Sequence, residues 1–150
     1  MNDANANNPD GNVIFSGTKE VAENLKFDQS RLQEWLGDSL PSAGKIIDVA
    51  QFKGGQSNPT YKIITEQKEL VLRRKPPGIL LPSAHAVDRE YKVMTALKDT
   101  AVPVPQTYGL CEDEDVIGTS FFVMDFLDGD IYWDLLLEDK SLEERKAIYK

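Results

Sequence analysis

Three short strand-like segments, joined by connections too short to contain a helix, constrain the fold of this chain most. They span residues 46–52, 60–65 and 70–74, and each is rich in apolar and β-branched side chains. Parallel neighbours would need crossover connections of a dozen or more residues. The sequence therefore predicts three consecutive antiparallel strands, which begin an α+β fold.

One helix is expected to follow the third strand. The prolines between residues 76 and 82 favour an extended linker, and an apolar stripe then predicts an amphipathic helix over residues 84–98, with Val87, Tyr91, Met94 and Leu97 on one face. Two further strands are predicted at residues 107–111 and 120–126, with the acidic residues 112–115 at the tip of their hairpin. The predicted sheet has five antiparallel strands with one inserted helix.

The flanks of this unit have weaker patterns. Residues 1–17 are rich in Asn, Asp and Gly and are expected to form a disordered leader. A helix capped by Asp28 is predicted over residues 28–40, with an apolar stripe of Leu32, Trp35, Leu36 and Leu40. A short helix is expected over residues 131–137, and Ser141 with Glu144 forms a capping box for another. We therefore expect a lobe over residues 18–127 and the beginning of a truncated second lobe over residues 128–150.

The composition is that of a globular domain, with 41% hydrophobic and 28% charged residues. The sequence has neither an apolar run long enough to cross a bilayer nor a secretory signal at its N-terminus. The single cysteine, Cys111, is interpreted as a buried and inert strand residue. These features favour a cytoplasmic location.

Charge is distributed unevenly along the chain. The net charge is -8, yet residues 53–98 carry nine basic and four acidic side chains, so this segment is positive. The negative net charge argues against nucleic acid or an anionic membrane as the main partner, and a positive segment in an acidic protein indicates a discrete anion site. An RNA-binding role is disfavoured because aromatic residues are not interleaved with these cations. Four of the lysines are interpreted as solvated: Lys62, Lys68, Lys92 and Lys98.

The connection between the first two predicted strands could hold phosphate. Gly54 and Gly55 would let the backbone approach an anion closely, and the polar residues that follow, Gln56, Ser57 and Asn58, offer hydrogen-bond donors. A glycine pair between strands is by itself often a plain turn. The interpretation of this connection as a phosphate site therefore depends on Arg73 and Glu90.

Strand alternation places Val71 and Arg73 on one face of the third strand and Arg74 on the other. A valine against a flat base, with a cation two positions on, suits a nucleotide site. Glu90 lies at the edge of the apolar stripe of the inserted helix, from which it could hold Arg73 extended. The competing interpretations are a solvated basic strand end and an exposed helix pair of Glu90 with a lysine. His85 is interpreted as a local cap or a surface residue.

The strings GGQSNPTYKI, LVLRRKPPGILLPSAHAVDREYKVMTAL and VPVPQTYGLCEDEDVIGTSFFVMDFLDGDIYWDL resemble the aminoglycoside phosphotransferase and choline-kinase-like family. The resemblance covers roughly residues 27–150 and is greatest to the branch whose kinase domain precedes an acyl-CoA dehydrogenase domain. It implies a protein-kinase-like N-terminal lobe that binds ATP with Mg²⁺. The acceptor it implies is a small hydroxylated molecule, either a hydroxyacyl-CoA or an aminoglycoside.

The resemblance also implies roles for individual residues. GGQSN would be the phosphate loop, Arg73 would replace the usual lysine, and Glu90 would be its ionic partner. Residues 123–127 would be the hinge, where Met124 lines the base pocket and the backbone of Asp125 and Leu127 pairs with adenine. The phosphate loop differs from the glycine-rich loop of kinases because it lacks the G-x-G-x-x-G spacing.

The family's catalytic loop and metal ligands are expected beyond residue 150, so residues 1–150 alone are expected to be inactive, with no catalytic or metal-binding residue among them. The alternative from another class is a noncatalytic kinase-like module for binding or regulation. The oligomeric state is left open.

Overall fold

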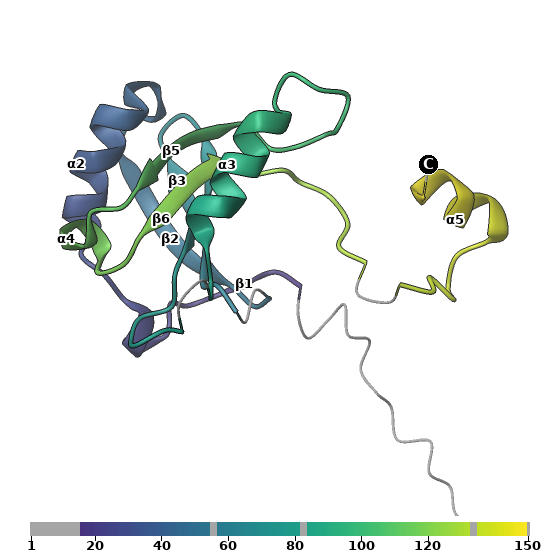
Figure 1. Ribbon diagram of the computed structural model, residues 1–150, viewed down its shortest axis with the longest axis horizontal. Helices are drawn as coiled ribbons and strands as arrows, with labels where there is room; N and C mark the ends of the chain where they lie inside the picture. Colours follow the sequence, from purple (N-terminus) through teal and green to yellow (C-terminus); the bar gives the residue numbers. More distant parts are fainter. Residues whose placement is uncertain (1–15, 55–56, 82–83, 133–134, 150) are drawn as a thin grey trace, which may run out of the picture. The chain divides into compact units, whose positions relative to one another are not determined.

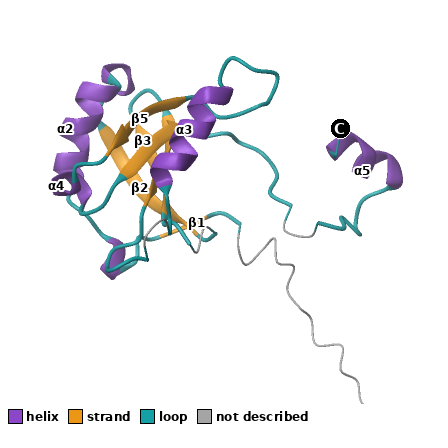
Figure 2. Ribbon diagram, in the orientation of Figure 1, coloured by secondary structure: helices purple, strands orange, loops and turns teal. Residues whose placement is uncertain are grey.

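The computed structural model describes residues 16–54, 57–81, 84–132 and 135–149 (Figure 1). The chain divides into a compact unit, Gly17–Leu127, and a second unit that includes Asp128–Lys150. The predicted leader, apart from Ser16 and Gly17, lies outside the described residues. The compact unit is α+β, as the sequence predicts (Figure 2).

One sheet of six strands, in the order β1-β2-β3-β4-β6-β5, organises the compact unit, and every neighbouring pair is antiparallel. The strands are β1 (Thr18–Lys19), β2 (Ile46–Phe52), β3 (Thr60–Thr65), β4 (Glu69–Arg74), β5 (Thr107–Cys111) and β6 (Phe121–Asp125). The five predicted strands are confirmed with bounds within one residue. The prediction missed β1, which adds two residues to the free edge of β2 and is too short to show a period.

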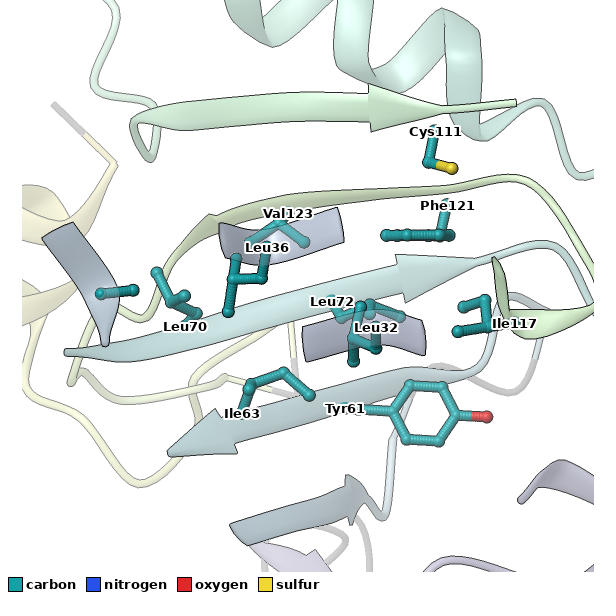
Figure 3. Packing of buried hydrophobic residues seen from close by; sticks show 11 residues of the cluster. Leu32, Leu36, Tyr61, Ile63, Leu70, Leu72, Cys111, Ile117, Phe121 and Val123 are labelled. Atoms are coloured by element: carbon teal, nitrogen blue, oxygen red, sulfur yellow. The ribbon is translucent and has the colours of Figure 1, made fainter. Parts of the chain in front are cut away.

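Helix α2 (Gln29–Ser39) covers one face of the sheet. Asp28 caps it by accepting a hydrogen bond from Ser30 N at 2.9 Å. Leu32 and Leu36 from its apolar stripe are fully buried against alternate residues of the strands: Tyr61, Ile63, Leu70, Leu72, Phe121 and Val123 (Figure 3). The period-two alternation of the strands and the helical spacing of α2 therefore produce one continuous core.

Gly109 in β5 allows α2 to approach the sheet closely. A Cβ atom at this position would lie 3.1 Å from Cζ2 and 3.2 Å from Cη2 of Trp35, whose ring packs edge-on against Phe121 with centroids 4.8 Å apart. These distances are shorter than ordinary van der Waals contacts, so a side chain at this position would have to displace the Trp35 ring, which already packs against Phe121. Packing therefore favours glycine here.

Replacing Gly109 by Ala is expected to lower the free energy of unfolding by about 1–3 kcal/mol, the usual cost of overpacking. Urea denaturation followed by tryptophan fluorescence would measure the change. The matched control is Gly37→Ala, because Gly37 lies in α2 and a Cβ atom added there would have nothing within 4 Å. The control should be neutral or stabilising by up to about 1 kcal/mol; equal effects of the two changes would contradict the packing argument.

Helix α3 (Val87–Leu97) lies on the opposite face, against β5 and β6 (Figure 1). Val87 packs there with the strand residues that point away from α2, namely Val71, Phe122 and Met124. The helix begins three residues later than predicted, and the residue before it, Ala86, provides no side-chain cap. This face is the smaller of the two cores, and it carries the candidate site.

Arg74 lies on the α2 side of the sheet and is only 3% exposed. Its Nε donates to Thr119 Oγ1 at 2.8 Å, and its guanidinium lies 5.8 Å from the centre of the Phe27 ring. Thr119 in turn donates to the carbonyl of Lys75 at 3.0 Å. Arg74 therefore fastens the end of β4 to the segment before β6, and it points away from Arg73 as strand alternation predicts.

The acidic residues 112–115 are exposed and lie in the connection between the antiparallel strands β5 and β6, as predicted. Asp113 accepts from Asp115 N at 2.9 Å and caps a short helix, α4 (Glu114–Ile117), which ends at Gly118 with φ of 90°. Ile117 is buried in the larger core. An Asp cap and a glycine stop enclose a single apolar turn, and burial of that turn favours a helix over an exposed loop.

The second unit contains α5 (Leu142–Ile148), whose predicted capping box is present: Ser141 N donates to Glu144 Oε2 at 2.7 Å, and Glu144 N donates to Ser141 Oγ at 3.3 Å. The helix predicted over residues 131–137 is not formed by its described members, and Trp133 and Asp134 lie outside the described residues. Leu137 has φ of 49°, which no right-handed helix accommodates. Among the described residues, no helix is both long and apolar enough to cross a membrane.

Candidate nucleotide site

An ion pair joins β4 to α3 on the smaller-core face. Arg73 Nε lies 3.2 Å from Glu90 Oε2, and each side chain is about one-third exposed. Arg73 is placed on this face by strand alternation, and Glu90 by its position one turn into α3. The structure thus brings together two residues that were predicted to be partners.

The Arg73–Glu90 contact is ionic and poorly aligned. Arg73 Nε is buried, and its N–H is not directed at Glu90 or at another described acceptor, although the carboxylate is within ion-pair distance. A buried donor of this kind is costly unless a ligand or water satisfies it. Glu90 holds the guanidinium by charge on its buried side, and the exposed third of the Arg73 side chain remains able to bind an anionic ligand.

Asn58 reaches the same carboxylate from the β2–β3 connection. It is 5% exposed, and its Nδ2 donates to Glu90 Oε1 at 3.0 Å. Its Oδ1 lies 3.1 Å from His85 Nδ1. Asn58 was predicted to offer a donor to phosphate, but in the structure both ends of its side-chain amide have protein partners.

The interpretation of His85 as a cap or surface residue is wrong. The residue is half-buried, lies outside α3, and contacts Asn58. Its φ of 57° is in the left-handed region, which non-glycine residues seldom occupy. No local sequence signal could have revealed this contact, because 27 residues separate the two side chains.

Val71 and Met124 are paired across β4 and β6 and are each 8% exposed. Two aromatic rings border them: Phe52 and Phe126 stack with an interplanar angle of 20° and centroids 6.2 Å apart. Lys62 Nζ lies 4.0 Å from the centre of the Phe126 ring and 3.0 Å from Glu69 Oε1. This apolar surface beside Arg73 suits a flat base. The interpretation of Lys62 as a solvated residue is therefore wrong.

The side chain of Asp125 points to the other face of β6. Asp125 Oδ1 accepts from Tyr108 OH at 2.6 Å, and Lys68 Nζ donates to the same hydroxyl at 2.7 Å. Burial, followed by the hydrogen bond to Asp125, raises the pKa of the Tyr108 hydroxyl. The hydrogen bond with Tyr108 raises the pKa of the Lys68 ammonium. Asp125 thus anchors the end of β6, and the interpretation of Lys68 as merely solvated is also wrong.

The remaining proposed residues are Leu127 and four residues of the β2–β3 connection. Leu127 is 63% exposed and is the last residue of the compact unit. Gly54 and Ser57 flank the two loop residues that lie outside the described ranges, Gly55 and Gln56. A groove of about 630 Å³ borders the loop and α3, lined by Ser57, Asn58, Ala84, His85, Ala86, Arg89, Glu90, Val93 and Met94. No cluster of three or more potential metal ligands occurs among the described residues.

The sequence matches the family model of the phosphotransferase enzyme family over residues 48–150. It is 44% identical over 134 residues to acyl-CoA dehydrogenase family member 10 of Mus musculus and 42% identical over 141 residues to family member 11 of Homo sapiens. These matches cover 88% and 89% of this chain but only 12% and 18% of the relatives. The chain therefore spans less than one-fifth of the length of these relatives.

A solved structure of a "putative aminoglycoside phosphotransferase" from Ralstonia eutropha is also similar, with a TM-score of 0.68 and 44% sequence identity. The match covers 83% of this chain and 35% of that one. It supports the kinase-like α+β fold deduced from the strand order and from the helix after β4. On the sequence match and the shared fold together, the chain belongs to the phosphotransferase enzyme family.

Proposed function

We propose that residues 18–127 form the nucleotide-binding lobe of an ATP-dependent phosphotransferase, and that residues 128–150 begin its second lobe. The reaction would transfer the terminal phosphoryl group of ATP to a hydroxyl group of a small molecule. The Arg73–Glu90 ion pair is the observation that carries this proposal. Phosphoryl transfer depends mainly on holding the triphosphate and offsetting its charge, and a restrained cation does both.

The described residues fit a nucleotide. The Arg73 side chain is about one-third exposed, so its outer guanidinium nitrogens can donate to a phosphate oxygen while Nε stays beside Glu90. Val71 and Met124 would pack against the base, and the backbone of Asp125 and Leu127 would pair with its edge. In this proposal Gly54, Gly55, Gln56 and Ser57 surround the phosphates. ATP supplies the phosphoryl group, and Mg²⁺ would be held mainly by the phosphates with one or two carboxylates.

The acceptor classes that we propose follow from the relatives. Proteins named acyl-CoA dehydrogenases suggest a hydroxyacyl-CoA, and the solved structure suggests an aminoglycoside. The two classes are distinguished by measuring ADP release from ATP with each acceptor in turn. If the protein binds ATP but neither acceptor leads to release of ADP, the noncatalytic alternative would be favoured.

Nucleotide binding is tested directly by titrating the full-length protein with ATP in the presence of Mg²⁺. Calorimetry should show saturable binding, and a concentration of 100 times Kd should stabilise the folded state by about 2.7 kcal/mol. The thermal midpoint should therefore rise with ATP concentration. An absence of both binding heat and thermal shift would contradict the proposed function.

A further inference from the structure

The hydrogen bonds of Asn58 have a fixed direction. A carboxylate can only accept hydrogen bonds, so the Asn58 atom that lies 3.0 Å from Glu90 Oε1 must be the Nδ2 donor. The other end of the amide, Oδ1, can then only accept. His85 Nδ1, at 3.1 Å from Oδ1, must therefore carry a proton.

This chain of contacts continues to the proposed phosphate-binding cation. Glu90 receives Asn58 on Oε1 and pairs with Arg73 through Oε2 at 3.2 Å. His85, Asn58, Glu90 and Arg73 thus form one directed series of contacts, from imidazole to amide to carboxylate to guanidinium. It joins the segment before α3, the β2–β3 connection, α3 and β4.

Two further observations indicate that this arrangement is built into the fold. Asn58 is more than nine-tenths buried, so its amide would be costly to leave without partners. His85 keeps a backbone conformation, φ of 57°, that persists only where surrounding contacts maintain it. Among the described residues, Asn58 is the partner to which the His85 side chain is hydrogen-bonded.

We propose that Asn58 and His85 are positioning residues that hold Glu90, and through it Arg73, in place before the nucleotide binds. This inference rests on the proposed function and extends it to two residues that need not touch the nucleotide. Without the amide donor, the contact of Glu90 that remains among the described residues is the poorly aligned one to Arg73. Its carboxylate could then rotate, and Arg73 would lose the restraint that favours phosphate binding.

The first test is spectroscopic and needs no nucleotide. His85 is the only histidine of this chain, and its signals in the full-length protein are assigned by their loss in H85N. Two-bond nitrogen–proton spectra at about pH 9, well above the ordinary imidazole pKa of about 6.5, report which ring nitrogen carries the proton. The Nδ1–H tautomer is expected; the Nε2–H tautomer in the wild type would overturn the proposal.

Glu90→Gln provides a sharper form of this test. The side-chain amide introduced by E90Q should turn its oxygen to Arg73 and its NH₂ to Asn58, since Arg73 offers only donors. The Asn58 amide must then flip, and its NH₂ would face His85. The tautomer should change from Nδ1–H to Nε2–H, although no atom of His85 was altered. An unchanged tautomer in a folded E90Q protein would overturn the directed series.

The second test compares nucleotide affinity in variants of His85. His85→Ala removes the donor and is expected to weaken ATP binding by about five- to tenfold, as loss of one restraining hydrogen bond would. His85→Asn places an amide nitrogen where Nδ1 was and tolerates positive φ, so it should stay within about twofold of the wild type. Asn58→Asp, which sets a carboxylate against Glu90, should weaken binding more than either. Equal affinity in H85A and H85N would contradict a positioning role.

The two proposals fail in different ways. If the wild type does not bind ATP, the proposed function fails, while the tautomer experiments still decide whether the directed series exists. If the wild type binds ATP but H85A and N58D bind equally well, the positioning role fails and the proposed function remains. Thermal midpoints of all variants separate loss of affinity from loss of folding.

Discussion

Replacing Arg73 by Met is expected to weaken ATP binding by about 10- to 100-fold, which corresponds to about 1.4–2.7 kcal/mol. This is the range expected for hydrogen bonds to a charged group. Methionine keeps much of the aliphatic volume of the side chain but removes the charge and the buried Nε donor. Calorimetric titration of the full-length protein with ATP and Mg²⁺ would measure the loss.

Two controls make this result specific. Arg73→Lys keeps the charge without the planar guanidinium, so its affinity should lie between those of the wild type and R73M. Lys92→Ala removes an exposed cation of α3 whose contact is with Asp88 at 3.5 Å. Such exposed pairs contribute little, so K92A should bind ATP normally. Wild-type affinity in folded R73M would exclude Arg73 from the site.

Replacing Phe121 by Ala is expected to lower the free energy of unfolding by about 3–5 kcal/mol, the usual cost of deleting a large buried aromatic ring. Phe121 has no exposed surface, packs edge-on with Trp35, and lies in the core between α2 and the sheet (Figure 3). Its loss would leave a cavity between the two. Domains of this size are stable by only about 5–15 kcal/mol, so the effect is large.

Urea denaturation measures this effect: the midpoint of unfolding should be lower in F121A than in the wild type, without a comparable change in the slope of the transition. Ile47→Ala is the control, because Ile47 also lies in a strand but is 66% exposed. A surface substitution of this kind is expected to change stability by no more than about 0.5 kcal/mol. A loss below about 1 kcal/mol in F121A would contradict the assignment of Phe121 to the core.

Much of the fold followed from local periodicity. The bounds of β2, β3 and β5 agree with the prediction, and in β3 the buried side chains alternate along the strand as a period of two requires. α5 begins where the capping box predicts. By contrast, β1 consists of only two residues, and it forms only because the edge of β2 is available to pair with.

The errors have a common physical cause. His85 was expected to be a local cap or a surface residue, yet its Nδ1 contacts Asn58 Oδ1. Lys62 and Lys68 were expected to be solvated, yet they lie over the rings of Phe126 and Tyr108. In each case the deciding partner is remote in sequence, and charge or polarity alone does not reveal it.

The features of the candidate site also fall into two groups: those that follow from local sequence and those that depend on tertiary packing. By itself, the sequence determined that Arg73 and Arg74 point to opposite faces and that Glu90 lies near the apolar stripe of its helix, because both follow from backbone periods. Only the tertiary structure decided that Asn58 binds Glu90 and His85, over separations of 32 and 27 residues. Local periodicity specifies the direction of a side chain, whereas the distance between remote side chains is set by how the elements pack.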